Sequence, residues 1–339
     1  MVNVRGYIST HFTKAFLTVF LPFFLIISLV YLVRIASLTA QIQISFSEMF
    51  WLYSFMLPDI IFYTLPLSFV AALTNVLMRL SLDNELIALY ALGLKAEKVL
   101  KSLFVLGLLF SLLLLFVSFF AMPLSKQYYQ SFKTAKQAEA KLNIIPGKLG
   151  QKFGDYYVYV KESKEDTFHT IVIYNRINKD QEQFFASQSG KLKKENNQTS
   201  LLLNEGYGYT YNDTKLQQAQ YKHLEVYDTT KQKDFRYQDI FNYWLQAAVN
   251  QKLMGKILFF IFISFIPLLS IYPVASFAMI NPRHDANHSF LIIFAVSFFF
   301  YFAASSLNKW GNFFLLCLAI FVIGLIGKWL FEKRVAKYF

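Results

Sequence analysis

The sequence predicts an α-helical membrane protein with six transmembrane helices and an inserted all-β domain of jelly-roll type. Three observations carry this prediction: six long apolar stretches, a central region of alternating apolar and polar residues, and a very apolar composition. Hydrophobic residues make up 55% of the 339 residues, 38 residues are Phe, and the mean hydropathy is +0.38. Soluble globular domains rarely have this composition, so we expect the chain to lie in a membrane.

Six stretches are long enough, or nearly so, to cross a bilayer. About 20 residues are needed, because roughly 30 Å of hydrocarbon is crossed at about 1.5 Å per helical residue. The second stretch is too long for one crossing, so we expect Asp59 at a helix start in the outer interface, just after Pro58. The alternative is an ionisable residue inside the span, which is costly and often functional. The six stretches are Ala15 to Val33, a span within Met49 to Met78, Leu103 to Met122, Ile257 to Ile280, Ser289 to Leu307 and Gly311 to Gly327.

Basic residues in the short connections predict the orientation, because cytoplasmic loops carry an excess of Lys and Arg. With the N-terminus inside, the short outside connections hold only Arg34 and Lys309. Both termini are therefore expected in the cytoplasm, with the central segment outside. The basic residues inside would be Arg5, Lys14, Arg79, Lys95, Lys98, Lys101, Arg283, Lys328, Lys333, Arg334 and Lys337.

The central segment, residues 123–252, changes composition sharply and separates helices one to three (residues 1–122) from helices four to six (residues 253–339). A polar helix over 132–142 leads into a region where apolar residues alternate and turn residues recur, which predicts antiparallel strands. An aromatic interfacial helix over 235–248 leads back to the membrane. We expect a small sandwich or jelly roll with strands at 156–160, 169–177, 182–192, 199–211 and 219–227.

The sequence holds no recognisable set of catalytic or metal-binding residues. No phosphate-binding G-x-x-x-x-G-K-[ST] loop occurs, and neither does G-x-S-x-G nor H-E-x-x-H. His284 and His288 have a spacing that could suit a metal, but they follow a short turn, so we expect no metal and no cofactor. The net charge of +12 follows from the topology, and no nucleic-acid-binding motif accompanies it. Glu195 to Thr199 fits a bacterial N-glycosylation acceptor centred on Asn197, with chance occurrence as the alternative.

The stretch between the second and third apolar stretches, Arg79 to Lys98, is charged and amphipathic. We predict a helix over residues 81–93, capped by Ser81 or Asp83 and ended by Gly93. Leu82, Leu86 and Leu89 would form its apolar face. Such a helix can dock into the groove of another protein. The alternative, a helix lying on lipid headgroups, usually has a polar face rich in Lys and Arg, whereas acids stand at the start here.

This stretch resembles the coupling segment of the LptF/LptG permeases, the membrane half of the ABC transporter that extracts lipopolysaccharide. Further strings resemble the same family in order along nearly the whole chain. The V-R-I and N-P-R strings favour LptF over LptG. The strings are YLVRI (31–35), PDIIFYTLPLSF (58–69), YPVASFAMINPR (272–283) and SSLNKWGN (305–312).

The resemblance implies a function and a set of partners. The chain would be a permease subunit that extracts lipopolysaccharide or lipooligosaccharide from the inner membrane. It would pass this lipid to a periplasmic bridge toward the outer membrane, without catalysing a reaction itself. A separate LptB-type cytoplasmic ATPase dimer would drive it, beside an LptG-type partner permease and an LptC-type bridge protein. The first and fifth transmembrane helices would form a lateral gate with the partner permease.

The resemblance also assigns roles to individual residues. Glu85 matches the family's coupling acid and would pair with a basic residue of the ATPase, with Arg79 and Asp83 as supporting charges. Leu86 and Leu89 would belong to the same contact. Arg34 matches a base that faces the phosphates of lipid A, and Lys309 could add to it. An ordinary interfacial anchor remains the alternative reading of Arg34.

Other functions remain open at this stage. A lipoprotein- or efflux-type ABC permease is one, although such chains commonly have four transmembrane helices. A membrane enzyme acting on envelope lipids is another, and it would need clustered acids, His or metal ligands near a membrane face. A sensor or scaffold whose cytoplasmic helix binds a signalling partner is the third.

Overall fold

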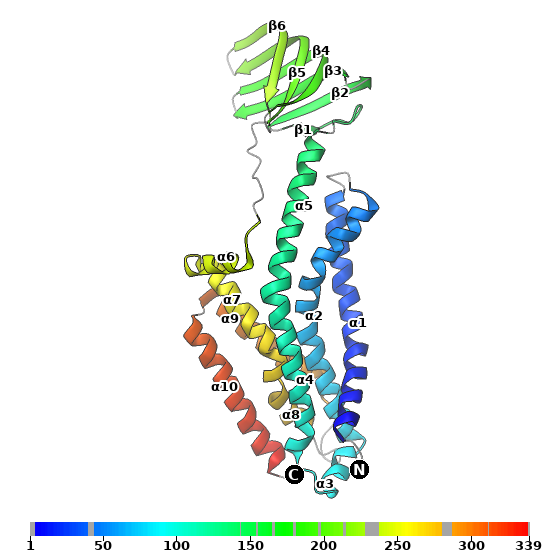
Figure 1. Cartoon of the computed structure of the whole chain (residues 1–339), viewed down its shortest axis with the longest axis vertical. Helices are drawn as coiled ribbons and strands as arrows, with labels where there is room; N and C mark the ends of the chain where they lie inside the picture. The colour runs from blue at the N-terminus through cyan, green and yellow to red at the C-terminus, as the bar shows by residue number, and fades with distance from the viewer. Residues whose placement is uncertain are drawn as a thin grey trace. The chain divides into compact units, whose positions relative to one another are not determined.

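The chain folds into two compact units, a helical unit and a β unit (Figure 1). The helical unit comprises Met1–Ser37, Phe46–Tyr129 and Tyr237–Phe339, and the β unit comprises Leu38–Ser45 and Gln130–Arg236. The computed structural model describes residues 4–39, 44–142, 144–153, 155–164, 167–178, 181–195, 198–212, 215–227, 237–279, 287–310 and 312–337.

Six helical segments among the described residues are long and apolar enough to cross a membrane, which confirms the predicted helical membrane class. The first two are single helices, α1 (Val4–Thr39) and α2 (Phe46–Leu82). The third joins α4 (Ala96–Phe116), the π-helical turn η1 (Val117–Ala121) and α5 (Met122–Leu142), and the fourth joins α7 (Gln251–Leu269) and α8 (Ile271–Ala278). The last two are α9 (Ser289–Trp310) and α10 (Phe313–Phe331), which continues into the π-helical η3 (Glu332–Ala336). Shorter helices are α3 (Glu85–Ala91), α6 (Ile240–Leu245) and the 3₁₀ turn η2 (Gln246–Ala248).

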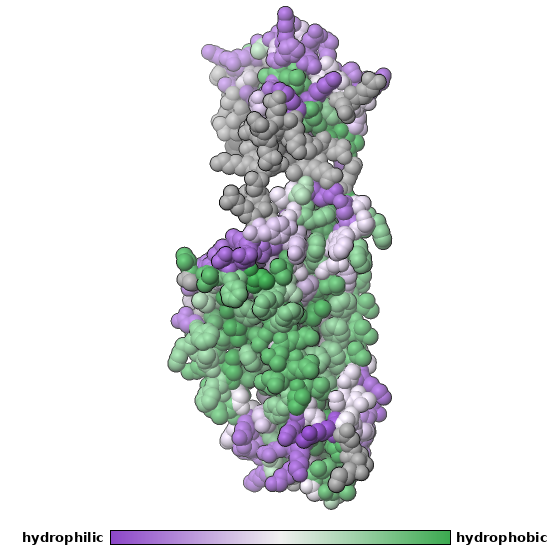
Figure 2. Space-filling view, viewed as in Figure 1, coloured by the Kyte–Doolittle hydropathy of each residue, from purple (hydrophilic) through white to green (hydrophobic). Residues whose placement is uncertain are grey.

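The helical unit is built around α2. In α2, 78% of the most apolar stretch is buried within the chain, whereas in α1 only 11% of the corresponding stretch is buried. Aromatic side chains of α2 fill the centre, where Phe62 packs edge-on against Phe260 of α7 at 5.1 Å between ring centroids. Figure 2 shows the complementary outer surface, a broad apolar band over the middle of the helical unit with polar residues gathered at its ends. Such a band is expected where lipid or other membrane helices are the surroundings.

The start of α2 differs from the prediction. The helix begins at Phe46 and runs through Pro58 and Asp59, so these residues lie inside it and do not mark its start. A proline inside a membrane helix is tolerated because nearby groups can satisfy the carbonyl that it leaves without a donor. The helix of 37 residues is about 55 Å long at about 1.5 Å per residue. It therefore exceeds the hydrocarbon thickness of roughly 30 Å, as the sequence indicated.

A hydrogen bond from Trp244 repairs the backbone of the third segment. Pro123 follows η1 and has no N–H, so the carbonyl of Phe119, four residues earlier, loses its usual helical donor. The indole Nε1–H of Trp244 in α6 donates to this carbonyl at 3.0 Å. One turn further along α5, the amide of Gln127 both donates to and accepts from the backbone of Gln238, at 3.1 and 2.9 Å. The chain segment that returns from the β unit is thus bonded to α5.

The aromatic interfacial helix expected over 235–248 is shorter than predicted. Among the described residues it comprises α6 and η2, and residues 235 and 236 lie outside them. Phe241 and Leu245 of α6 are exposed, as expected of aromatic and apolar residues at a membrane interface.

Glycine allows two close helix crossings. A Cβ on Gly255 of α7 would collide with the backbone carbonyl of Asn308 in α9. A Cβ on Gly107 of α4 would lie 3.2 Å from the carbonyl of Pro267 in α7. Membrane helices associate through such small residues because close backbone approach increases their van der Waals contact.

The β unit is one six-stranded antiparallel sheet in the order β1-β2-β3-β4-β5-β6. The predicted inserted all-β domain is confirmed, and its strands are β2 (Tyr156–Lys164), β3 (Thr167–Asn178), β4 (Gln181–Glu195), β5 (Gln198–Asn212) and β6 (Lys215–Tyr227). The sequence analysis missed β1 (Gln151–Phe153), which is too short to show alternation. Each strand pairs with the next along the chain, an order simpler than that of a sandwich with crossing connections.

The apolar positions of neighbouring strands meet on one face of this sheet. Val160 of β2 lies opposite Ile171 of β3, and Val158 lies opposite Ile173, and all four are buried. Leu201 and Leu203 of β5 belong to the same cluster. Because side chains alternate between the two faces of a strand, this register requires the period of two seen in the sequence.

We expect Gly255→Ala to destabilise the helical unit. The added methyl group collides with a backbone atom of α9, which cannot move away as a flexible side chain could. The cost should be about 1–3 kcal/mol, as for other overpacked sites. The measurement is the apparent melting temperature of the purified chain in detergent.

Gly324→Ala in α10 is the matched control, because a Cβ there meets nothing within 4 Å. It should leave the melting temperature unchanged or slightly higher. Equal losses in the two variants would show that the α7–α9 crossing is not as tight as described.

Candidate functional site

The segment between α2 and α3 turns at a residue in the left-handed conformation. The predicted helix over 81–93 is interrupted: α2 ends at Leu82, and α3 begins at Glu85. Asn84 between them has φ +59°, a region that Asn tolerates better than most residues. Asp83 makes no side-chain cap, and its carboxylate instead accepts from Arg79. The prediction of one continuous capped helix was therefore wrong at its start.

Gly93 ends α3 as predicted. The φ of Gly93 is +78°. Its N–H donates to the carbonyl of Tyr90 at 2.9 Å, and the N–H of Leu94 donates to the carbonyl of Leu89 at 3.2 Å. This pair of bonds is a Schellman motif, which satisfies carbonyls that the last helical turn leaves without donors. A residue with a Cβ would be strained at this position.

The apolar face of α3 points into the chain itself. Leu86 is only 3% exposed and belongs to the core of the helical unit, and Leu82 and Leu89 are partly buried against that core. Burial also raises the pKa of Tyr90 on the same side. This differs from the expected outward-facing docking face. The exposed apolar residues are Ile87 and Leu92, and Leu92 is 79% exposed.

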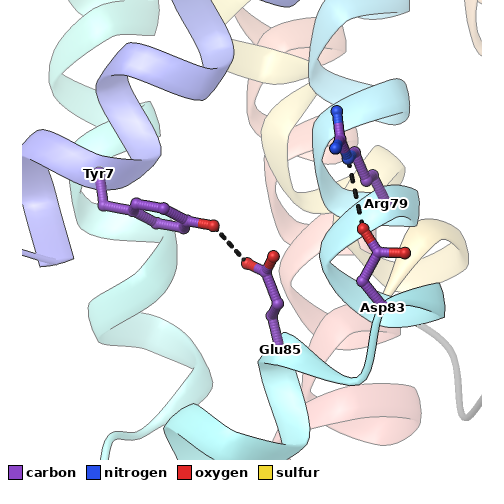
Figure 3. A network of polar contacts seen from close by, with 4 residues as sticks. All are labelled: Tyr7, Arg79, Asp83 and Glu85. Atoms are coloured by element: carbon purple, nitrogen blue, oxygen red, sulfur yellow. Dashed lines mark hydrogen bonds and ion pairs between the residues drawn. The ribbon is translucent and has the colours of Figure 1, made fainter.

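The charges of this segment form two separate pairs (Figure 3). The hydroxyl of Tyr7 in α1 donates to Oε2 of Glu85 at 2.8 Å. Arg79 Nε lies 3.3 Å from Oδ2 of Asp83. Both partners of the second pair are largely exposed, so it should contribute at most about 0.5 kcal/mol to stability. The carboxylates of Glu85 and Asp83 thus lie at the surface where another protein can reach them.

The base of the segment is fixed to the last helices of the chain. The buried hydroxyl of Ser81 lies 2.9 Å from the carbonyl of Ala278 at the end of α8 and 2.9 Å from that of Leu77. In turn, the guanidinium of Arg334 in η3 lies over the ring of Phe277 in α8, 4.4 Å from its centroid. Figure 1 shows α3 at the same end of the helical unit as the start of α1 and the end of α10. We call residues 79–94 the coupling segment, after the family segment that they resemble.

Arg34 and Lys309 lie on different helices, and both are exposed. The guanidinium of Arg34 is 5.3 Å from the ring centroid of Tyr31, one turn earlier in α1. Lys309 is in the last turn of α9, next to the exposed Trp310. Each charge is therefore accessible at the surface of the helical unit.

Sequence reasoning missed Tyr7, which is 78 residues away from Glu85. Nothing in its neighbourhood in the sequence signals the contact. Arg283, His284 and Asn197 were named in the sequence analysis and lie outside the described residues. Among the described residues, no three His, Cys, Asp or Glu side chains lie together as a metal site would require.

We expect Leu86→Ala to destabilise the chain by about 2–5 kcal/mol, because it opens a cavity in the core. Leu92→Ala removes the same atoms from an exposed position and should change stability by less than about 0.5 kcal/mol. The measurement is again the apparent melting temperature of the purified chain. Similar losses from both substitutions would contradict the inward orientation of α3.

Comparison with known proteins identifies the family. No curated protein matches the chain. The model of the family described as "Lipopolysaccharide export system permease LptF/LptG" matches residues 6–333, nearly the whole chain. This range includes the β unit, the coupling segment and nearly all residues of the six helical segments that are long and apolar enough to cross a membrane. The chain therefore belongs to the LptF/LptG family of lipopolysaccharide export permeases.

Proposed function

We propose that this chain is the LptF-type permease subunit of an ABC transporter that extracts lipopolysaccharide or lipooligosaccharide from the inner membrane. The chain itself is non-catalytic, and a separate LptB-type ATPase dimer supplies the energy. The observation that carries this proposal is the coupling segment: Glu85 stands in the first turn of a short helix that buries Leu86 in the core. A force applied to α3 therefore acts directly on the helical unit.

The orientation follows from the same segment. The coupling segment and both chain termini lie in the cytoplasm, where the ATPase is, and the β unit lies in the periplasm. The excess of Lys and Arg at the end of the helical unit that holds α3 supports this. The ATPase contacts Glu85, Asp83 and Arg79 together with the exposed Ile87 and Leu92. Leu86 and Leu89 hold α3 on the permease.

An LptG-type permease covers the exposed faces of α1 and α9. Four phenylalanines are spaced four residues apart along α9, and each is more than half exposed. They are Phe290, Phe294, Phe298 and Phe302. Neighbouring rings stack, with Phe294 and Phe298 at 6.0 Å and Phe298 and Phe302 at 6.2 Å between centroids. Only 22% of the most apolar stretch of α9 is buried in this chain. The two helices together form the lateral gate for the lipid.

The lipid's phosphates bind at Arg34, with Lys309 as a second base. A guanidinium binds phosphate through two parallel hydrogen bonds, which an ammonium cannot do. In the periplasm, an LptC-type bridge protein adds a strand to β6, which stands at one end of the order of the described strands.

We expect Glu85→Gln to weaken association with the ATPase, and Glu85→Lys to abolish it, because a base on the ATPase then faces a neutral or a like-charged group. The measurement is co-purification of LptB-, LptG- and LptC-type proteins with this chain, followed by ATP hydrolysis and lipid release in proteoliposomes. The loss of one charged contact should weaken association about tenfold or more.

Glu97→Gln is the control, because Glu97, like Glu85, is an acid in the first turn of a helix at the same end of the unit. It should assemble and transport normally. If Glu85→Lys assembles and releases lipid like the wild type, the coupling role is wrong. A binding partner that shows no ATP-dependent lipid release would favour a sensor or scaffold instead.

We expect Arg34→Ala to weaken lipopolysaccharide binding about tenfold, the effect of losing a charge-assisted contact. The affinity of Arg34→Lys should lie between those of the wild type and Arg34→Ala, because the charge stays and the two parallel hydrogen bonds of the guanidinium are lost. Lys14→Ala, a substitution near the opposite end of the same helix, is the control. Binding is measured with the assembled complex at several salt concentrations. An unchanged affinity in Arg34→Ala would leave Arg34 as an interfacial anchor.

A further inference from the structure

One contact of the coupling segment connects it to α1, a helix whose most apolar stretch is little buried in this chain. Tyr7 lies near the start of α1, and its hydroxyl donates to Oε2 of Glu85 at 2.8 Å (Figure 3). Glu85 is the acid at the start of α3, so the bond joins α1 to α3 directly.

The start of α1 is packed in place around this bond. Ile8 and Phe12, which follow Tyr7 in α1, are almost completely buried in the same core that holds Leu86. The ring of Tyr7 contacts that of His11, one turn on, with 4.3 Å between centroids. The packed start of α1 and the contact with His11 therefore hold the hydroxyl in position.

The middle of α1, by contrast, makes little contact with the rest of this chain. Only 11% of its most apolar stretch is buried. A second hydrogen bond, between the hydroxyls of Ser28 and Tyr53 of α2, holds its distant half at 2.6 Å. Because so little of its most apolar stretch is packed against this chain, α1 can move relative to the other helices when its start is moved.

Glu85 can accept hydrogen bonds from two partners at once. A carboxylate has two oxygens and about four acceptor positions. Tyr7 occupies one position on Oε2, so Oε1 can accept from a cationic side chain of another protein. The hydroxyl and such a base would both stabilise the charged carboxylate and need not compete for it.

We propose that Tyr7 is a positioning residue that transmits movement of Glu85 to α1, the helix that carries Arg34. This inference rests on the proposed function, since it takes the ATPase to be the protein that holds Glu85. Movement of the ATPase then shifts α3 and, through the Tyr7 hydroxyl, the start of α1. Glu85 serves the attachment of the ATPase, whereas Tyr7 serves the coupling of its work to lipid release.

The test is Tyr7→Phe in the assembled complex, with ATP hydrolysis and lipid release measured in the same proteoliposomes. The ring and its packing remain, and only the hydroxyl is lost. We expect normal assembly and ATP hydrolysis within about twofold of the wild type. The number of lipids released per ATP should fall about fivefold, the effect of one lost hydrogen bond on an equilibrium.

Two variants separate this role from others. Tyr53→Phe removes the other hydrogen bond described for α1, that with Ser28, and should leave the ratio of lipid to ATP unchanged. Glu85→Gln should weaken ATPase association, which Tyr7→Phe leaves normal. The complexes that still form should keep the wild-type ratio of lipid to ATP, since the amide oxygen of Gln can still accept from Tyr7.

The outcomes distinguish the inference from the proposed function. If the wild-type complex releases no lipid on ATP hydrolysis, the proposed function fails. If the wild type transports and Tyr7→Phe has the same ratio of lipid to ATP, the inference fails and the function stands. The inference also fails if the Tyr7→Phe chain does not assemble. It fails as well if Tyr53→Phe lowers the number of lipids released per ATP as much as Tyr7→Phe does.

Discussion

The burial of α2 is the constraint on which the rest of the helical unit depends. Most of its C-terminal half is buried and packs against α7, α8 and α9, so the last turn of α2 cannot shift independently of these helices. The Ser81 hydroxyl adds a polar bond at this point, to the end of α8. Because α3 follows after only a two-residue turn and buries Leu86 in the same core, the coupling segment is a rigid extension of the packed centre. A partner that moves α3 has to move the centre of the permease with it.

Backbone hydrogen bonding explains the most irregular part of the unit. In hydrocarbon an unsatisfied carbonyl costs several kcal/mol, so each break in a helix needs a substitute donor. Pro123 creates such a break, and Trp244 supplies the donor to the carbonyl of Phe119. The indole comes from α6, immediately before the fourth membrane segment, so the same bond also joins the chain on either side of the inserted β unit.

Much of this architecture could be predicted from the sequence, because periodicity and apolar length report directly on burial. The six membrane segments and five of the six strands were found in this way. The orientation of α3 was not, because the positive φ of Asn84 rotates the helix relative to α2, and no pattern of apolar residues reveals such a turn. The resemblance to the permease family pointed to Glu85, but Tyr7 could not be found, since a single hydrogen bond across 78 residues leaves no local signal. The start of α2 could not be predicted for a related reason: whether a proline ends a membrane helix depends on the surrounding helices, which a single segment does not show.

The order of strands in the β unit has a consequence for how the chain is made. Every strand pairs with the one synthesised just before it, so no pairing waits for a distant part of the sequence. Domains with such local contacts fold faster than those in which remote strands must meet. The sheet can therefore grow strand by strand during synthesis, before the fourth membrane segment exists. A newly made chain then exposes one growing edge at a time, which limits the interval in which unpaired strands could associate with other chains.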